Sequence, residues 1–286
     1  MSQSSLSKLS ERMKNIREIV VVLSGKGGVG KSTTSCQLAL SLAAKGHKVG
    51  VLDIDICGPS VPGILGISHA EIVQSNDGWL PVELPIKSEQ GEQVLIKCMS
   101  IAFLLKSKDD AVIWRGPKKN AMIRQFLEDV NWGQLDYLIV DTPPGTSDEH
   151  ITLAELLRDL NQARSESGMV DEGQFLNAVI VTTPQQVSMV DVAREITFCN
   201  KLNIPIKGII ENMSGYVCPC CKEITYIFGS GGGKKLSTEY NIPYLGSIPI
   251  EPELANAEDN GINFIQQFSD SVTAVQFNNI VNQLLN

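Results

Sequence analysis

The chain has 286 residues, of which 43% are hydrophobic and 20% are charged, the balance of a globular protein with a large core. Its formal net charge is −8 and its pI is about 5.0, so overall charge gives no reason to expect nucleic-acid binding. No apolar stretch approaches the ~20 residues needed to span a bilayer and no apolar signal segment lies near the start, so we expect neither a membrane partner nor secretion.

Residues 1–17 are rich in serine and place apolar residues at helical spacing, with basic residues between them. This composition could indicate a mitochondrial presequence, but Glu11 and Glu18 do not fit the acid-poor pattern of such segments. We therefore expect a short helix beside the first strand, in a protein of the cytoplasm. This gives an N-terminal extension at 1–17 and a single domain at 18–286.

From residue 19 onward, apolar strands alternate with helices. We expect strands at 19–23, 49–53, 135–141, 176–181, 206–210 and 244–248. We expect helices at 31–45, 117–130, 186–200 and 232–240, and a hairpin-like excursion at 72–99. Continuous apolar runs that alternate with helices predict an α/β fold, in which a mostly parallel sheet is flanked by helices on both faces.

Seven cysteines, an odd number, suggest reduced intracellular thiols rather than a disulfide framework. Four of them are scattered among apolar or small residues: Cys36, Cys57, Cys98 and Cys199. We expect these four to be small buried side chains of the core.

The residues Gly25-Lys26-Gly27-Gly28-Val29-Gly30-Lys31-Ser32-Thr33 fit G-x-x-x-x-G-K-[ST], the phosphate-binding P-loop. Its glycines let successive backbone N–H groups converge on phosphate oxygens. Lys31 can reach the β- and γ-phosphates, and the Ser32 hydroxyl can ligate Mg²⁺. The additional Lys26 indicates that this is not a generic nucleotide hydrolase.

The same glycines also fit G-x-G-x-x-G, and Asp53 lies about where a ribose-binding acid would stand in an NAD(P) oxidoreductase. Two features favour an ATPase instead. The pair Lys31-Ser32 follows the glycines directly, and a second buried strand ends at Asp141, before Thr142-Pro143-Pro144-Gly145. An acid at the end of a buried strand is where a Walker-B group would hold Mg²⁺.

Two acids end the strand at 49–53, in the sequence Asp53-Ile54-Asp55. Neighbouring positions at a strand end alternate sides, so one carboxylate could cap the following turn while the other faces the γ-phosphate. A carboxylate facing the γ-phosphate could orient the attacking water.

Three of these features together resemble the deviant Walker-A ATPases, the MinD/ParA-like group: Lys26 with Lys31, Asp53-Ile54-Asp55, and 141–146. The resemblance implies a dimer that encloses two ATP molecules, in which Lys26 reaches the partner's phosphates and acts like an arginine finger.

The same resemblance implies roles for other residues. Asp55 would position water, and Asp141 would bind Mg²⁺ through water. Asn212, which follows a strand, would recognise adenine, and a loop at Pro249 and Ile250 would flank the base.

Cys218, Cys220 and Cys221 are clustered in a loop near 212–228. A structural zinc needs four ligands and no second ligand pair lies nearby, while a thioredoxin-like pair belongs at the start of a helix in a different fold. Buried inert thiols are a poor reading of a loop that contains proline. Thiolates three residues apart, as at Cys218 and Cys221, can bind one edge of a metal cluster. The two thiolates of one chain cannot complete the four-cysteine shell of a [4Fe–4S] cluster, but those of two chains can. The spacing therefore predicts a cluster that bridges a dimer.

Four stretches add a closer resemblance: 114–117, 125–133, 141–150 and 211–221. They are similar to the Mrp/NBP-type, or ApbC-like, iron–sulfur scaffold ATPases, and the similarity extends from residue 19 to about residue 258. The family's paired cysteines map onto Cys218 and Cys221, whereas Cys220 departs from the family pattern.

The larger eukaryotic cytosolic member of this family has additional ferredoxin-like N-terminal cysteines, and residues 1–35 here contain none. The chain therefore resembles the smaller, Cfd-type subunit. That resemblance implies a slow ATPase, in a heteromer with the larger scaffold or as a homodimer. It would assemble a labile [4Fe–4S] cluster and pass it, with downstream targeting factors, to cytosolic and nuclear apoproteins.

Two alternatives stay open. One is a mitochondrial iron–sulfur carrier of the same family, against which the short N-terminus argues. The other is a MinD/ParA-like spatial regulator, which would need a basic or amphipathic surface for a membrane or DNA.

Overall fold

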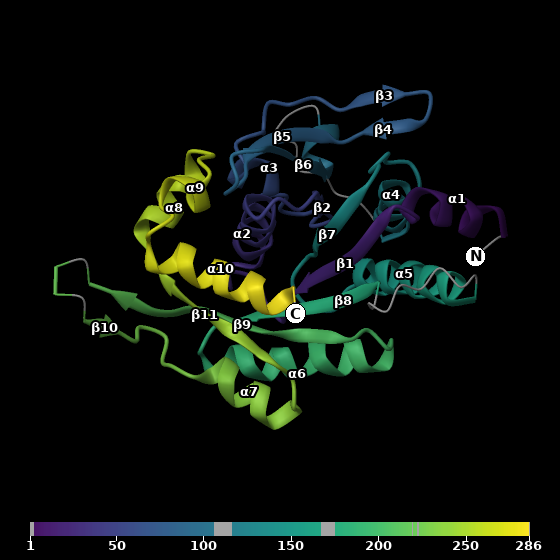
Figure 1. Cartoon of the computed structure of the whole chain (residues 1–286). Helices are drawn as coiled ribbons and strands as arrows, with labels where there is room; N and C mark the ends of the chain where they lie inside the picture. The colour runs from purple at the N-terminus through teal and green to yellow at the C-terminus, as the bar shows by residue number, and fades with distance from the viewer. Residues whose placement is uncertain (1–2, 106–115, 167–174, 219, 222, 286) are drawn as a thin grey trace.

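The computed structural model describes residues 3–105, 116–166, 175–218, 220–221 and 223–285. The strands of the main sheet are β1 Ile16–Leu23, β2 Val49–Asp53, β5 Val82–Lys87, β6 Gln93–Ser100, β7 Leu135–Asp141, β8 Leu176–Thr182, β9 Ile206–Val217, β10 Ile224–Thr225 and β11 Tyr244–Ile250. Their order across the sheet is β10-β9-β8-β1-β7-β2-β6-β5, and β11 pairs with β9 (Figure 1).

The pairings of the main sheet are parallel except at its ends, where β5 and β10 run antiparallel to their neighbours. This confirms the predicted α/β fold with a mostly parallel sheet. In a parallel sheet the carboxyl ends of the strands meet at one edge. Here Val22 of β1 and Asp53 of β2 are both register partners of Asp141 on β7. The P-loop and both predicted acidic positions therefore lie at one edge.

Helices cover both faces of this sheet (Figure 1). They are α1 Gln3–Met13, α2 Lys31–Ala44, α3 Val61–Ile64, α4 Gly116–Glu128, α5 Asp148–Glu166, α6 Gln186–Lys201, α7 Gly232–Tyr240, α8 Pro252–Asp259, α9 Phe264–Gln267 and α10 Val272–Leu284. One apolar core forms under α2, α9 and α10, and a second forms under α1, α4 and α5. A smaller cluster joins α6 and α7 to β8 and β9.

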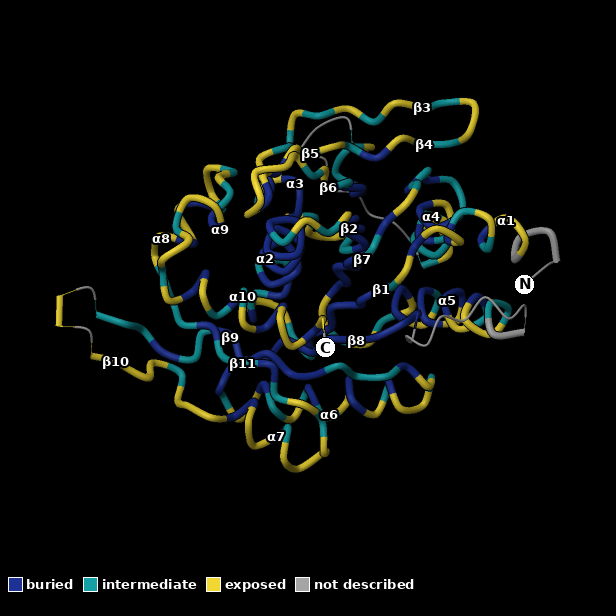
Figure 2. Tube along the Cα trace, in the orientation of Figure 1, coloured by how far each residue is buried: buried dark blue, intermediate teal, exposed yellow. Residues whose placement is uncertain are grey.

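Strand β1 shows why helices cover both faces of the sheet. Val20 and Val22 belong to the core under α2, while Ile19, Val21 and Leu23 belong to the core under α5. Successive side chains of a strand point to opposite faces, so a continuous apolar run supplies both cores. The central strands are accordingly buried along most of their length, as Figure 2 shows.

The segment at 72–99 is only partly the expected excursion. A small hairpin of β3 Val73–Ser75 and β4 Gly78–Leu80 stands apart from the main sheet. The rest forms β5 and β6, and β6 is a parallel neighbour of β2. The hairpin is confirmed here, because β5 and β6 pair antiparallel, but the excursion is wrong, because this hairpin extends the main sheet. The first half of β6 has exposed positions, so its sequence lacks the continuous apolar run of a central strand.

Five helices were not predicted: α3, α5, α8, α9 and α10. In α5 the signals were present, since Asp148 and Glu149 lie in the first turn and Leu153, Leu157 and Leu160 follow at helical spacing. None of the helices in the described ranges is both long and apolar enough to cross a membrane.

The N-terminal segment forms a helix, as expected, and the helix is integrated into the main body. Leu9 and Met13 of α1 are fully buried in the core shared with α4 and α5. The boundary between 1–17 and 18–286 falls inside β1, which begins at Ile16.

Cys36, Cys98 and Cys199 are buried, as predicted, and burial raises the pKa of each thiol. The prediction is wrong for Cys57, which is exposed. Cys57 lies in the turn beyond the carboxyl end of β2, so it is not packed into a helix or strand.

We expect α1 to contribute to the stability of the whole chain. Replacing the buried Leu9 by Ala leaves a cavity between α1 and its neighbours, so the free energy of unfolding should fall by about 2–5 kcal/mol. Urea unfolding followed by circular dichroism measures this. Ser7→Ala, on the exposed side of α1, should change it by less than about 0.5 kcal/mol. Equal stabilities of the two variants would contradict the packing.

Stability should also depend on pH through Glu195 of α6. This side chain is buried, and burial, with a smaller contribution from Asp191, raises its pKa to about 7. The folded chain therefore binds the proton more tightly than the unfolded chain, whose glutamates titrate near 4.5. The contribution of protonated Glu195 to the free energy of unfolding is therefore complete below pH 4.5 and is lost as the pH rises through 7.

Glu195→Gln should remove this pH dependence. At pH 8 its free energy of unfolding should exceed that of the wild type by up to about 3 kcal/mol, so it should unfold at a higher urea concentration. Urea midpoints measured from pH 4.5 to pH 8 test this, with the exposed Glu239→Gln as the matched control. A wild-type profile that Glu195→Gln leaves unchanged would contradict the assignment.

Candidate functional site

The P-loop connects β1 to α2 at the shared edge of the sheet. Gly28 and Gly30 have φ of 76° and 79°, which favours glycine at both positions. A Cβ on Gly30 would stand 2.1 Å from the Nδ2 of Asn212, whereas a Cβ on Gly28 would meet no atom within 4 Å. The loop is therefore packed tightly on its Asn212 side and open above Gly28.

Asp141 is the centre of a buried hydrogen-bonded group at the start of α2. Its Oδ1 accepts from the Lys31 Nζ at 2.8 Å and from the Ser35 Oγ at 2.7 Å, and its Oδ2 accepts from the Ser32 Oγ at 2.6 Å. The structure thus brings together the predicted Lys31, Ser32 and Asp141. Sequence reasoning missed Ser35, although it lies one helical turn after Lys31 and shares its face.

The two acids after β2 have different surroundings. Asp53 is buried, and its carboxylate accepts from the backbone N–H of Asp55 at 3.1 Å and from the Ser100 Oγ at 2.9 Å. Asp53 therefore holds the backbone at Asp55, and the Asp55 carboxylate in turn accepts from the backbone N–H groups of Cys57 and Gly58. Asp55 is half-buried, and burial raises its pKa, while Lys31 opposes that shift and Asp141 adds to it. These causes place Asp55 within the field of the P-loop site.

Lys26 lies against its own chain. Its Nζ donates to the Oε1 of Gln185 at 3.3 Å, and Gln185 is the residue before α6. Gly25 is packed against the same helix, because a Cβ there would stand 2.5 Å from the Cβ of Asp191. The expected reach of Lys26 to a partner stays a prediction.

Thr33 makes a contact that the sequence did not reveal. Its Oγ1 donates to the Glu258 Oε2 at 2.8 Å, and the Gln37 Nε2 donates to the other oxygen at 3.1 Å. Burial raises the pKa of Glu258, and these two hydrogen bonds oppose the shift. The last turn of α8 is thereby attached to the first turns of α2.

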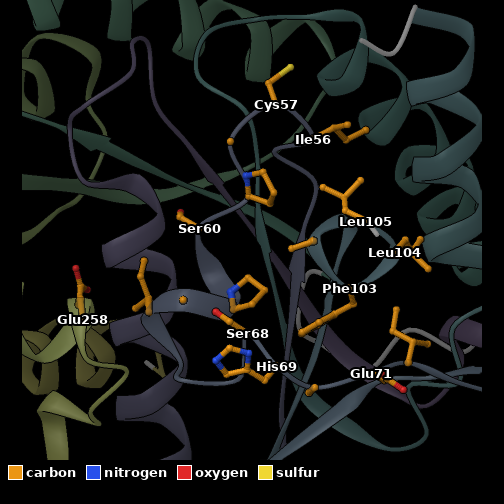
Figure 3. A pocket seen from close by; sticks show the side chains of 18 of the residues that line it. Ile56, Cys57, Ser60, Ser68, His69, Glu71, Phe103, Leu104, Leu105 and Glu258 are labelled. Carbon is orange, nitrogen blue, oxygen red and sulfur yellow. The ribbon is translucent and has the colours of Figure 1, made fainter. Parts of the chain in front are cut away.

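Glu258 also lines a cavity of about 1150 Å³ beside the P-loop edge. Ile56, Cys57 and Ser60, from the loop after β2, form one wall, and Phe103 faces them (Figure 3). No sequence motif marked this cavity.

Asn212 lies beside the P-loop on β9. Its Nδ2 donates to the backbone carbonyl of Val29 at 2.9 Å, and Ile248 of β11 is its register partner. Pro249 and Ile250 follow Ile248, so the sheet places them near Asn212. They are not a loop, however, and that expectation is corrected: both belong to β11, and the proline occupies an irregularity in the pairing where no regular ladder bond is needed.

The cysteines lie on a hairpin that extends from the body (Figure 1). We use the term cysteine hairpin for residues 213–231, without 219 and 222, which are outside the described residues. Cys218 is half-buried, and its backbone N–H donates to the Glu223 carbonyl at 2.9 Å. Cys220 and Cys221 are exposed. Hydrogen bonds from the backbone N–H groups of Cys221 and Cys220 lower the pKa of Cys218, which favours the metal-binding thiolate.

Beyond the cysteines, the hairpin exposes three large apolar side chains. The exposed fractions are 53% for Ile224, 55% for Tyr226 and 57% for Ile227. Apolar residues gathered on a projecting ribbon are typical of a surface that contacts a partner.

Residues of α4 and α5 contact the loop after β2 at the nucleotide edge. Lys119 donates to the Glu149 Oε1 at 2.7 Å and to the Cys57 sulfur at 3.3 Å, which ties α4 and α5 to the loop after β2. Trp114 and Arg115, two residues of the family resemblance, lie outside the described residues.

Comparison with known proteins gives consistent results. The model of the ParA family described as NUBPL iron-transfer P-loop NTPase matches residues 15–285. A cytosolic Fe-S cluster assembly factor NUBP2 homolog of Trichoplax adhaerens is 52% identical over 270 residues, which cover 94% of this chain and 95% of that protein. The cytosolic Fe-S cluster assembly factor CFD1 of Kluyveromyces lactis is 49% identical over 289 residues, covering 100% of this chain and 96% of that protein.

Among solved structures, a nucleotide-binding protein of Archaeoglobus fulgidus in complex with ADP superposes with a TM-score of 0.73. It is 36% identical, and the match covers 90% of this chain and 91% of that one. The match to the family model covers nearly the whole chain, and the P-loop it requires stands at the sheet edge described above. The chain belongs to the ParA family of NUBPL-type iron-transfer P-loop NTPases.

Proposed function

We propose that this chain is an ATP-dependent scaffold of the cytosol that assembles a labile [4Fe–4S] cluster between two subunits and transfers it to cytosolic and nuclear apoproteins. One observation carries the proposal: a single strand, β9, leads from Asn212 beside the P-loop to Cys218 on the hairpin. The names of the two relatives support the same cargo and compartment.

The phosphate end of the site fits ATP with Mg²⁺. The space above Gly28 is open, and an ammonium, a hydroxyl and a carboxylate are already in contact at Lys31, Ser32 and Asp141. In this assignment the backbone of 25–33 and Lys31 hold the phosphates, Ser32 ligates the metal ion, and Asp141 binds it through water. The metal would neutralise phosphate charge.

The base end of the site is assigned to Asn212, with Pro249 and Ile250 beside it. The Asn212 amide already donates to the P-loop carbonyl of Val29, so its oxygen is the group left to accept a hydrogen bond from adenine.

Two side chains are assigned to hydrolysis. Asp55 orients the attacking water, and its raised pKa makes its carboxylate a better proton acceptor. Lys26 leaves Gln185 and neutralises charge on the nucleotide of the partner subunit, as an arginine finger does. Hydrolysis is slow in this proposal because it times a conformational step.

The cluster is the cargo of the hairpin. Cys218 and Cys221 of each chain supply two thiolates, so two chains complete a four-cysteine shell. The exposed Ile224, Tyr226 and Ile227 would be covered by the second chain. That chain is the larger scaffold paralogue with ferredoxin-like N-terminal cysteines, or a second copy of this one.

We expect Cys218→Ala combined with Cys221→Ala to abolish cluster binding, because no other thiol of the hairpin can replace both ligands. Anaerobic reconstitution followed by iron and sulfide analysis and a visible spectrum measures this. Cys220→Ala is the matched control within the same turn and should load fully. A double variant that retains the wild-type iron content would contradict the assignment.

We expect alanine variants of the two P-loop lysines to lose different properties. Lys31→Ala should weaken ATP binding, because the cation is lost from the phosphate site, and slow hydrolysis by about 100-fold or more. Lys26→Ala should retain ATP affinity and lose about 1,000-fold in turnover, because its charge acts only in the dimer. Calorimetry and phosphate release measure the two quantities, and Lys201→Ala, at the exposed last residue of α6, is the control. Equal losses of affinity in both variants would argue against a role in trans for Lys26.

A further inference from the structure

The base of the cysteine hairpin is closed by one buried carboxylate. Glu211 of β9, the second residue before the hairpin, is 2% exposed. Its Oε2 accepts from the backbone N–H of Gly233 at 2.6 Å, and its Oε1 accepts from that of Gly231 at 3.4 Å. These are the residues where the chain returns from the hairpin and enters α7. Glu211 therefore fixes the returning arm of the hairpin to the departing arm.

The next residue fixes the departing arm to the P-loop. Asn212 donates to the Val29 carbonyl, and the terminal methyl carbon of Met213 would lie 3.9 Å from a Cβ on Gly30. Side chains of neighbouring strand residues point to opposite faces. Consequently Asn212 contacts the P-loop on one side of β9, while Glu211 contacts the amino end of α7 on the other.

A second contact connects the start of α7 with the segment that binds Lys26. A Cβ on Gly232 would stand 2.6 Å from the carbonyl oxygen of Pro184, so α7 begins in close contact with the segment before α6. Gln185, the next residue, accepts the hydrogen bond from Lys26. The start of α7 therefore contacts β9 and the segment before α6, and each of these also contacts the P-loop, through Asn212 and Gln185 respectively.

We infer that Glu211 is a positioning residue that couples the P-loop to the cysteine hairpin, so that nucleotide binding changes the accessibility of Cys218 and Cys221. The inference rests on the proposed function, since it gives the nucleotide a route to the cluster ligands. A shift of Asn212 moves Glu211 because they are adjacent in one strand. Glu211 then moves the start of α7 and the returning arm, because its carboxylate is bonded to backbone N–H groups rather than to a flexible side chain.

The test uses the full chain without iron, so that it is separate from the cluster-binding experiment. Alkylation of Cys218 and Cys221 by iodoacetamide is followed by mass spectrometry, with and without Mg²⁺ and a non-hydrolysable ATP analogue. In the wild type the nucleotide should change these alkylation rates by about fivefold or more, the usual lower range of coupling between sites. In Glu211→Gln and Glu211→Ala the change should fall below about twofold, with nucleotide affinity retained.

Gly233→Ala tests the same contact from the other side. Its Cβ would stand 3.0 Å from the Cβ of Glu211 and 3.3 Å from the Oε2, so it displaces the carboxylate without removing the charge. It should lose the coupling as well, which keeps the test valid if Glu211→Ala does not fold. Glu239→Gln, at an exposed position of α7, should behave as the wild type.

Two results would overturn the inference. One is a wild-type chain whose cysteines alkylate at the same rate with and without the nucleotide. The other is a folded Glu211→Gln or Gly233→Ala variant that keeps the full wild-type response. Either result leaves the iron content of the reconstituted protein, and hence the proposed function, to be judged separately.

Discussion

The buried ion pair between Lys31 and Asp141 joins the start of α2 to the end of β7, and the geometry of the nucleotide edge depends on it. Removing both charges from water costs several kcal/mol, so such a pair is tolerated only where further hydrogen bonds satisfy the carboxylate. Ser32 and Ser35 supply those bonds. A phosphate that reached Lys31 would compete with Asp141 for the same ammonium. The ion pair therefore positions the Lys31 ammonium, which can exchange Asp141 for a phosphate.

The parallel sheet is what brings that pair together from distant parts of the chain. Val22 and Asp53 are both register partners of Asp141, so three strand ends stand in line. This much could be predicted from the sequence, because each strand is largely apolar and ends at an acid or just before the P-loop glycines. The different surroundings of Asp53 and Asp55 needed the structure, which buries Asp53 against Ser100 and leaves Asp55 half-buried near Lys31.

The remaining differences come from packing that local patterns do not report. The bond from Thr33 to Glu258 joins residues 225 positions apart, and α8 itself was not predicted. The loop expected at Pro249 is instead the end of β11, where a pairing irregularity lets the strand include a proline that cannot donate to the ladder. Cys57 has neighbours of a buried type, and only the path of the turn after β2 exposes it.

The adjacency of Glu211 and Asn212 explains why the two candidate sites cannot move independently. An extended strand has little freedom between neighbouring residues, and the next residue, Met213, has φ of 55°, a left-handed conformation that costs roughly 1–2 kcal/mol for a side chain of this kind. That conformation persists only while contacts on both sides define it. Asn212 holds Val29 on one face, and Glu211 holds Gly233 on the other. Loosening either contact relaxes the constraint on Met213, and the hairpin begins at that residue.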